Sequence, residues 1–467
     1  MFNYLETLQQ YGDRCAYRIL DGANVTEKSY RRYLKDANIA AARLEEKFGD
    51  ITGKHIGIYE NSSYEYAALL AAIIFSRAVA VPLNNLETAE NISFAIKTAK
   101  LDGLIADNWT FSDPGVQVIS ISEILTGKIT DKRLSDFGDD EADRESLIIF
   151  TSGTTSLSKG VVISAKSLFG GKKVALPKAC MAGKLDCVGM RAYTNFPLYH
   201  IGGICVWLSW TTHGCTTYLS RDPRAILTDL ESQVLDTAGV VPATLNLWMN
   251  SLRRGHYDRL GRVKHVMTGG AAIAPEVVKE YLDHDITVAQ YYGMSELGGF
   301  VTCNYDSVGH ASSAGQAIDD VEIQIIDGEI CIKYWGNMQG YIDNEEATKE
   351  TLKDGMMYTG DLGYIDNEGY LFITGRKKNL IILSSGENVS PEELEGFLYK
   401  NPSVKECKVY EKDDRIHAGI FCETGDQEDI KRYVADLNKR TPIYKRIYTI
   451  DFRDTAFEKT ASGKIKR

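Results

Sequence analysis

The sequence predicts a large layered α/β domain followed by a small α+β domain. The chain has 467 residues, 44% of them hydrophobic and 25% charged, which fits a soluble globular protein with more than one domain. Helix and strand patterns alternate through the first third of the chain, as layered α/β folds require. A second set of helix and strand patterns fills residues 376–467 and is large enough for a core of its own.

The N-terminal elements follow from hydrophobic spacing. Residues 30–49 predict a helix whose apolar side chains lie on one face and which ends at Gly49, a common helix-terminating residue. That face consists of Tyr33, Ala37, Ala41, Leu44 and Phe48. The next predicted elements are a strand at 54–60, a helix at 62–75, a buried strand at 78–83 and a strand at 145–150.

The C-terminal elements have equally clear signals. Ser390, Pro391 and Glu393 predict a helix start with proline in the first turn and a capping box. Further elements are a strand at 404–411, a strand at 415–423 and a helix at 426–440. The polar basic stretch 374–379 separates the two sets, so we place the domains at 1–375 and 376–467, with a hinge near 376–379.

Charge and cysteine usage restrict the function and the compartment. A net charge of −11 disfavours general binding to nucleic acid or to anionic membranes, because both select a basic face. The nine cysteines are scattered without a CxxC pair, which indicates free thiols in a reducing compartment. No signal peptide is evident, and Arg77 interrupts the most apolar segment, Tyr66–Leu83, which is too short to span a bilayer. We therefore expect a cytoplasmic protein without a membrane span.

The segment Ile148–Ser164, IIFTSGTTSLSKGVVIS, has the composition of an anion-binding loop. It is not a Walker loop, because Ser158 and not glycine precedes Lys159. Gly153 and Gly160 would let the backbone turn and present N–H groups, serines and threonines supply hydroxyl donors, and Lys159 supplies charge. Composition alone is equally consistent with a solvated serine/threonine loop.

This loop resembles the TSGTTGxPKG signature of the adenylate-forming superfamily: acyl-CoA and aryl-CoA synthetases, peptide-synthetase adenylation domains and beetle luciferases. Further segments resemble that family's motifs, in the family's order, over nearly the whole chain. They are Phe196–Gly203 (acyl pocket), Thr268–Ile273 (adenine pocket), Tyr291–Glu296 (YGxTE motif), Gly328–Tyr341 (the segment before the ribose site), Tyr358–Ile381 (ribose site and hinge) and Thr460–Arg467 (the catalytic-lysine loop).

The resemblance implies the roles of residues at the phosphates of ATP. A carboxylate must approach the α-phosphate, so positive charge is needed where two anions meet. Lys464 would be the adenylation lysine, and Glu296 would bind Mg²⁺, which prefers carboxylate, phosphate and water oxygens. The residues implied to hold the β- and γ-phosphates are Thr151, Ser152, Gly153, Thr154, Thr155 and Lys159.

The resemblance also implies residues for binding the nucleoside, for binding the acid and for the hinge. Tyr292 would stack on adenine, Asp361 would accept from the ribose hydroxyls, and His200 with Tyr199 would border the acid carboxylate. The full nucleoside set is Gly270, Ala271, Tyr292, Gly293, Ser295, Asp361 and Arg376. Lys378 occupies the hinge position, where many members have aspartate.

The sequence also departs from the family pattern. Ser156 and Ser158 replace the usual loop glycine and proline, so we expect ATP binding with altered loop stiffness. The sequence stops at Arg467, three residues after Lys464, so we expect the lysine loop to dock less firmly.

The predicted function is an AMP-forming acid–thiol ligase, an acyl-CoA synthetase with ATP, Mg²⁺ and coenzyme A. Two alternatives stay open: loading of the acyl group onto the phosphopantetheine of a carrier protein, and a non-catalytic nucleotide-binding protein. The substrate would be a small carboxylic acid, with a preference for aryl or medium acyl acids, and its identity is open.

Overall fold

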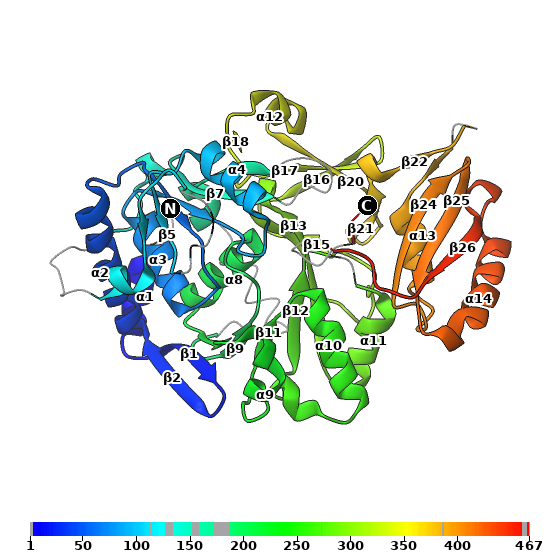
Figure 1. The fold of residues 1–467 in the computed structure, drawn as a ribbon, viewed down its shortest axis with the longest axis horizontal. Coiled ribbons are helices and arrows are strands. Elements are labelled where there is room, and N and C mark those ends of the chain that lie inside the picture. The colour runs from blue at the N-terminus through cyan, green and yellow to red at the C-terminus, as the bar shows by residue number, and fades with distance from the viewer. Residues whose placement is uncertain are drawn as a thin grey trace.

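The computed structural model describes residues 3–107, 109, 111, 114–126, 134–151, 158–170, 187–271, 273–384, 387–459 and 465–466. Over these residues the chain forms a large N-terminal unit and a smaller C-terminal unit, placed side by side in Figure 1. The prediction of a large α/β unit followed by a small α+β unit is confirmed.

The first sheet of the large unit has seven strands in the order β18-β8-β7-β4-β3-β5-β6 within the described residues. Its centre is parallel, and β7, β8 and β18 pair antiparallel. Its strands are β3 (His55–Ile58), β4 (Val79–Pro82), β5 (Gly103–Ile105), β6 (Val118–Ile119), β7 (Glu145–Thr151), β8 (Lys159–Ser164) and β18 (Gly340–Tyr341).

The second sheet has nine strands in the order β15-β14-β13-β12-β11-β9-β10-β1-β2 in the same part of the chain. Strands β10, β9, β11, β12 and β13 run parallel, and the strands at both edges turn back antiparallel. Its strands are β1 (Cys15–Asp21), β2 (Asn24–Ser29), β9 (Arg191–Thr194), β10 (Thr216–Ser220), β11 (Thr237–Gly239), β12 (His265–Gly269), β13 (Thr287–Met294), β14 (Gly299–Asn304) and β15 (Gln316–Ala317).

Three helical layers enclose these two sheets. One face of the first sheet packs on α4, and its other face packs on a shared layer that includes α2, α3 and α8. The second sheet lies between that shared layer and α9, α10 and α11. In the described part of the large unit the α-helices are α1 (Tyr4–Tyr11), α2 (Tyr30–Phe48), α3 (Tyr64–Phe75), α4 (Ala89–Ala99), α5 (Ile121–Leu125), α6 (Ala165–Phe169), α8 (Ile201–Thr212), α9 (Ile226–Leu230), α10 (Pro242–Arg253), α11 (Pro275–Asp283) and α12 (Glu345–Thr351).

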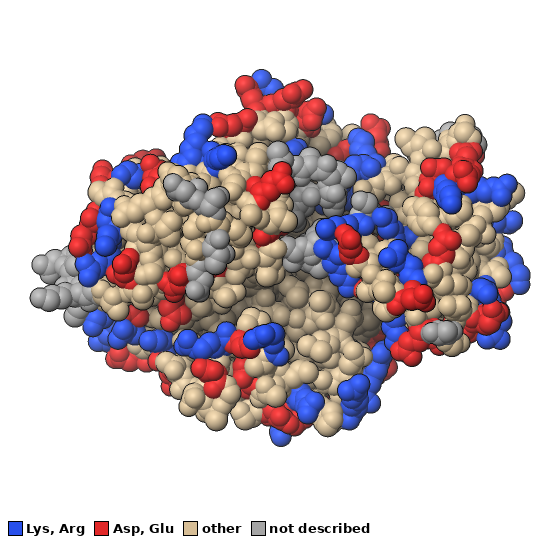
Figure 2. Space-filling view, viewed as in Figure 1, with Lys and Arg blue, Asp and Glu red and all other residues tan. Residues whose placement is uncertain are grey.

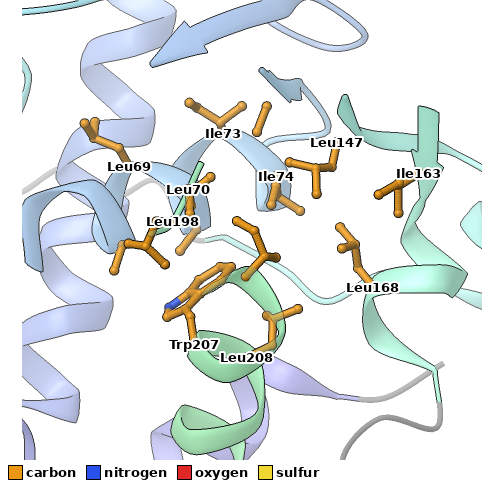
Figure 3. Packing of buried hydrophobic residues seen from close by; sticks show 14 of the residues in the cluster. Leu69, Leu70, Ile73, Ile74, Leu147, Ile163, Leu168, Leu198, Trp207 and Leu208 are labelled. Carbon is orange, nitrogen blue, oxygen red and sulfur yellow. The ribbon is translucent and has the colours of Figure 1, made fainter. Parts of the chain in front are cut away.

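The shared helical layer is apolar on almost every side. In α3 every residue except Glu65 is buried, as expected for a helix placed between two layers. Figure 3 shows Leu70 and Ile74 of α3 facing Trp207 and Leu208 of α8. This contact fixes the two sheets relative to each other, and with them the loops that form the site.

A third sheet leads to the small unit. It contains β16 (Glu322–Ile326), β17 (Glu329–Lys333), β19 (Leu352–Lys353), β20 (Met356–Ile365) and β21 (Leu371–Arg376). The small unit has a separate core that is built from residues 383–447. Its elements are β22 (Ile381–Ile382), β23 (Asn388–Val389), α13 (Pro391–Leu398), β24 (Glu406–Lys412), β25 (Arg415–Phe421), α14 (Gln427–Arg440) and β26 (Ile447–Arg453). A separate core is consistent with a boundary at 375/376, which stays a prediction.

Most predicted elements are confirmed, and two local details are wrong. Gly160 is not a turn residue: it lies within β8, opposite Phe150. The capping box at α13 is half formed, because Ser390 Oγ accepts from the Glu393 N–H while the Glu393 carboxylate binds Lys445 at 2.7 Å. The eight cysteines within the described ranges are all free thiols, as expected.

No helix in the described part of the chain is long and apolar enough to cross a membrane. The predicted cytoplasmic location stays a prediction.

Candidate active site

Twelve of the predicted site residues lie within the described parts of the chain. They are Thr151, Lys159, His200, Gly270, Ala271, Tyr292, Gly293, Ser295, Glu296, Asp361, Arg376 and Lys378. The other five, Ser152, Gly153, Thr154, Thr155 and Lys464, lie outside the described residues.

The stem of the predicted phosphate-binding loop is a β-hairpin. Thr151, the last residue of β7, pairs with Lys159, the first residue of β8. The Thr151 hydroxyl donates to the Lys159 carbonyl at 3.4 Å. The Lys159 ammonium lies over the ring of Tyr341, 4.7 Å from its centroid. This cation–π contact directs the ammonium toward β18 and the groups around it.

Glu296 is a buried carboxylate at the turn between β13 and β14. It lies in the short 3₁₀ helix η5 (Ser295–Leu297) with 8% of its surface exposed. Its Oε1 accepts from the Tyr341 hydroxyl at 2.9 Å, and its carbonyl accepts from the Met338 N–H at 2.7 Å. Burial and the charge of Glu296 raise the pKa of Tyr341, so this hydroxyl stays protonated and donates.

The surroundings of Glu296 fit Mg²⁺ held mainly by phosphates. No group of three or more His, Cys, Asp or Glu side chains capable of holding a metal occurs among the described residues. A single oriented carboxylate is what Mg²⁺ uses when phosphates and water supply the remaining oxygens. Lys159 and Glu296, both in contact with Tyr341, would then act on the same phosphate chain.

Asp361 is the second buried carboxylate of the site. Strand pairing places it directly opposite Arg376, whose Nε lies 2.5 Å from Oδ1. The Tyr292 hydroxyl donates to Oδ2 at 2.7 Å, and the Asp361 N–H donates to Thr359 at 3.1 Å. Arg376 and Tyr292 thus orient a carboxylate that is 4% exposed. Such a fixed acceptor suits a pair of ribose hydroxyls, and Arg376 would share it with them.

The predicted nucleoside residues divide into an open side and a packed side. Gly270, at the end of β12, has a φ of 86°, and a Cβ there would meet nothing within 4 Å. A Cβ at Gly293 would lie 2.0 Å from the Gly299 carbonyl, so the close approach of β14 requires this glycine. Space for a base therefore lies beside Gly270, whereas Gly293 supports the strand that carries Tyr292.

The acid-side residues lie at the start of α8. The rings of Tyr199 and His200 are 4.9 Å apart, and both border a cavity of about 20 Å³ that Ser158 and Phe150 also line. Helix α8 also contributes Val206 and Trp210 to an apolar cluster, which we call the acyl-side cluster. It consists of Cys187, Met190, Ala192, Val206, Trp210, Cys215 and Met267, with Phe196 and Tyr291 packed against it.

Lys378 lies at the start of the small unit, in η6 (Lys377–Asn379). Partial desolvation and then the charges of Arg376 and Lys159 lower its pKa, and Asp361 opposes them. The charges of Arg376, Asp361 and Lys159, all predicted nucleotide-binding residues, therefore act on Lys378, whose hinge role stays a prediction. Figure 2 shows one face of the molecule hollowed, with Lys and Arg gathered on the rim of the hollow toward the small unit.

The structure adds neighbours of the predicted site residues to which the sequence analysis gave no role. Tyr341 links Lys159 to Glu296, and the acyl-side cluster includes Tyr291 and Trp210. Tyr341 gave only a weak signal, because it lies in the Gly328–Tyr341 segment without a charge of its own. Alternation along β13 could have predicted that Tyr291 and Tyr292 face opposite sides of the strand.

The described ends of the C-terminal tail show how the Lys464 loop is attached. Lys459 and Ile465 form a bridge on either side of residues 460–464, and Lys408 donates to the Lys466 carbonyl at 3.1 Å. The segments flanking the loop thus bind to β24 of the small unit. The weaker docking of the loop itself stays a prediction.

Comparison with known proteins decides the family. The model of the AMP-binding enzyme family matches residues 5–342, more than two thirds of the chain. The chain belongs to this family. A 2-succinylbenzoate–CoA ligase from Listeria monocytogenes is 30% identical over 84% of this chain and 82% of its own length. A protein of the same name from Bacillus cereus is 27% identical over 84% of each chain.

Solved structures agree with the fold of this family member. O-succinylbenzoate CoA synthetase from Bacillus subtilis, in complex with its acyl-adenylate intermediate, has a TM-score of 0.84 and 23% identity, over 100% of this chain and 97% of that one. ATP-bound MatB from Rhodopseudomonas palustris has a TM-score of 0.86 and 23% identity, over 100% and 97%.

The predicted reaction class, an AMP-forming acid–CoA ligase, is confirmed at the level of this family. Ligases of this class use ATP, Mg²⁺ and coenzyme A, the cofactors and acceptor that the sequence predicted. The roles of the individual site residues stay predictions.

Proposed function

We propose that this chain converts an aromatic carboxylic acid to its acyl-adenylate and transfers the acyl group to coenzyme A, with 2-succinylbenzoate as the first candidate acid. The observation that carries the aromatic preference is the acyl-side cluster, to which α8, the helix that begins after His200, contributes Val206 and Trp210. The names of the curated relatives supply the candidate.

The acyl-side cluster supports a flat acid more than a long chain. Its aromatic members are packed closely, since a Cβ on Gly239 would lie 3.4 Å from both Phe196 and Trp210. The Tyr291 ring lies 4.9 Å from Phe300, and its hydroxyl contacts Met267 Sδ at 3.7 Å. Close packing limits the depth available to the acid, and the ring faces favour contact with an aromatic acid.

The cluster also offers a donor for a second polar group on the acid. Trp210 Nε1 is buried and has no hydrogen-bond partner among the described residues. A buried N–H without an acceptor is costly, so an acceptor on the substrate would stabilise it. A keto or second carboxylate group, as 2-succinylbenzoate carries, fits this requirement.

In the first half-reaction a carboxylate oxygen of the acid attacks the α-phosphorus of ATP, and pyrophosphate leaves. Asp361 would hold the ribose, and Lys159 would bind the phosphates as their charge shifts toward the leaving group. Mg²⁺ bound to Glu296 would neutralise phosphate charge. Lys464 would stabilise the pentacoordinate α-phosphate, the role implied by the family resemblance.

In the second half-reaction the thiol sulfur attacks the acyl carbon. The S–H proton is lost, the C–S bond forms and the C–O bond to AMP breaks, so AMP leaves with that electron pair. Coenzyme A or a carrier-bound phosphopantetheine presents the same thiol, and coenzyme A is the acceptor we propose.

The test is pyrophosphate release from MgATP with 2-succinylbenzoate, benzoate, fatty acids and amino acids, with and without coenzyme A. We expect release with an aromatic acid, and AMP plus an acyl-CoA when the thiol is present. Release without any acyl-CoA would favour a carrier protein as acceptor. ATP binding without release for every acid would favour the non-catalytic alternative.

A matched pair of variants tests the pocket assignment. Trp210→Phe keeps the ring and removes the N–H, and it should raise the KM of an acid that bears a second acceptor while leaving benzoate little changed. Trp248→Phe is the control. Trp248 is also buried, and its Nε1 also has no partner among the described residues, but it lies on α10 and packs in the separate core that α10 forms with α9 and α11. Equal effects on both acids would contradict the assignment.

A further inference from the structure

The sheet of the small unit carries the end of the chain on one of its faces. Alternate residues of β24 and β25 lie in the core that also contains residues of α13 and α14. Because side chains alternate along a strand, Glu406 and Lys408 of β24 lie on the opposite face. The tail that follows β26 packs on this second face, since a Cβ on Gly419 of β25 would lie 3.1 Å from the Phe457 ring.

Glu406 holds this tail with both of its carboxylate oxygens. Oε2 accepts from the Phe457 N–H at 2.7 Å, and Oε1 lies 2.5 Å from the Lys459 ammonium. Only 13% of the Glu406 side chain is exposed, so this is not the fully solvated kind of ion pair that contributes little. The Arg453 guanidinium lies over the Phe457 ring, 4.4 Å from its centroid. The tail is thus fixed to the sheet as far as Lys459.

The segment 460–464 begins and ends at this anchor. On its two sides Lys459 and Ile465 form a bridge. Lys408, which follows Glu406 on the same face of β24, donates to the Lys466 carbonyl at 3.1 Å. One strand therefore holds both flanks of the segment. In Figure 1 the tail lies on the side of the small unit that faces the large unit.

We infer that Glu406 is a positioning residue for adenylation: through Phe457 and Lys459 it fixes the base of the segment that carries Lys464. The inference rests on the proposed function, in which Lys464 stabilises the pentacoordinate α-phosphorus. Displacement of a catalytic group by about 1 Å lowers a rate by roughly a hundredfold. Loss of the anchor should therefore slow adenylation without weakening the binding of ATP.

Glu406→Ala removes both contacts to the tail. With an acid that the wild-type protein activates, it should lower the single-turnover rate of pyrophosphate release about tenfold or more and leave the KM of MgATP within about twofold. Formation of acyl-CoA from supplied acyl-adenylate and coenzyme A should change by less than about twofold, because this step breaks the acyl C–O bond and forms no pentacoordinate phosphorus. A misfolded variant would lose both reactions equally.

Glu423→Ala is the matched control. The Glu423 carboxylate pairs at 3.2 Å with Lys405, a lysine that lies beside Glu406 in sequence and outside the tail. This exposed ion pair should contribute little, so both half-reactions should stay within about twofold of the wild type.

A double-mutant cycle shows whether Glu406 acts through Lys464. In a protein that already carries Lys464→Ala, Glu406→Ala should slow pyrophosphate release no further, because an anchor has no effect once the group that it positions is gone. Three results would overturn the inference: an equal loss in both half-reactions, full additivity in the cycle, or full activity of Lys464→Ala alone.

The anchor can be measured without any acid. Trypsin cleavage of the full-length protein after Lys459 should be about fivefold or more faster in Glu406→Ala than in Glu423→Ala, because the tail is released from the sheet. Faster cleavage in a protein that activates no acid in the panel would refute the proposed function and keep the anchor. Equal cleavage of the two variants would refute the anchor whatever the activity.

Discussion

Asp361 and Glu296 show how single residues position the chemistry. Each is a buried carboxylate with oriented donors, and each accepts from a tyrosine: Tyr292 for Asp361 and Tyr341 for Glu296. Burial alone disfavours an ionised carboxylate, and these donors offset that cost. Both carboxylates can therefore be held in fixed orientations before any ligand arrives.

The charge of Asp361 should matter more for nucleotide binding than for folding. Asp361→Asn keeps the shape but weakens acceptance from the ribose hydroxyls and from Arg376, so we expect AMP affinity to fall roughly tenfold or more. Equilibrium titration with AMP measures this. The control is Asp354→Asn, in the exposed turn before β20. Unchanged AMP affinity in D361N would refute the ribose role.

The Tyr341 hydroxyl should tune the metal site through Glu296. In Tyr341→Phe the ring under Lys159 remains, but Glu296 loses an orienting donor, and such changes lower metal affinity by about tenfold. The Mg²⁺ concentration that gives half-maximal pyrophosphate release should rise accordingly. Tyr334→Phe is the control, because the buried Tyr334 hydroxyl has no partner among the described residues. An unchanged Mg²⁺ requirement would contradict the link.

At the scale of elements, nearly every helix and strand that hydrophobic periodicity predicted is present in the structure. Of the predicted face of α2, Tyr33, Ala37, Ala41 and Leu44 are fully buried and Phe48 is partly buried. Gly49 ends the helix with φ 72°. Details that depend on tertiary neighbours were missed. Glu393 leaves its capping partner because Lys445, fifty-two positions away, offers a charged contact. No local pattern encodes that partner.

Gly160 illustrates the same limit and gives a test. A Cβ there would lie 2.6 Å from Ile342 and 3.1 Å from the Phe150 ring. Gly160→Ala should therefore destabilise the protein by about 1–3 kcal/mol through overpacking. Gly396→Ala is the control: Gly396 lies in α13 with open space around it, and alanine favours helix there. Denaturant unfolding compares the two. A neutral G160A would contradict the overpacking argument.

At the scale of the whole molecule, the site exists only where three sheets and the small unit meet. Lys159 belongs to the first sheet, Tyr292 to the second, and Asp361 with Arg376 to the third. Motif resemblance predicted these residues because it carries the family's spatial arrangement. It did not predict neighbours such as Tyr341 beneath Lys159 or Trp210 in the acyl-side cluster, since side-chain packing decides them.

The most direct test of the central claim follows one oxygen atom. The protein is incubated with MgATP, coenzyme A and a reactive acid whose carboxylate carries two ¹⁸O atoms, and AMP and acyl-CoA are analysed by mass spectrometry. Attack of the carboxylate on the α-phosphorus predicts one ¹⁸O in AMP and one in the acyl-CoA. Unlabelled AMP, or label in released phosphate, would contradict an acyl-adenylate pathway.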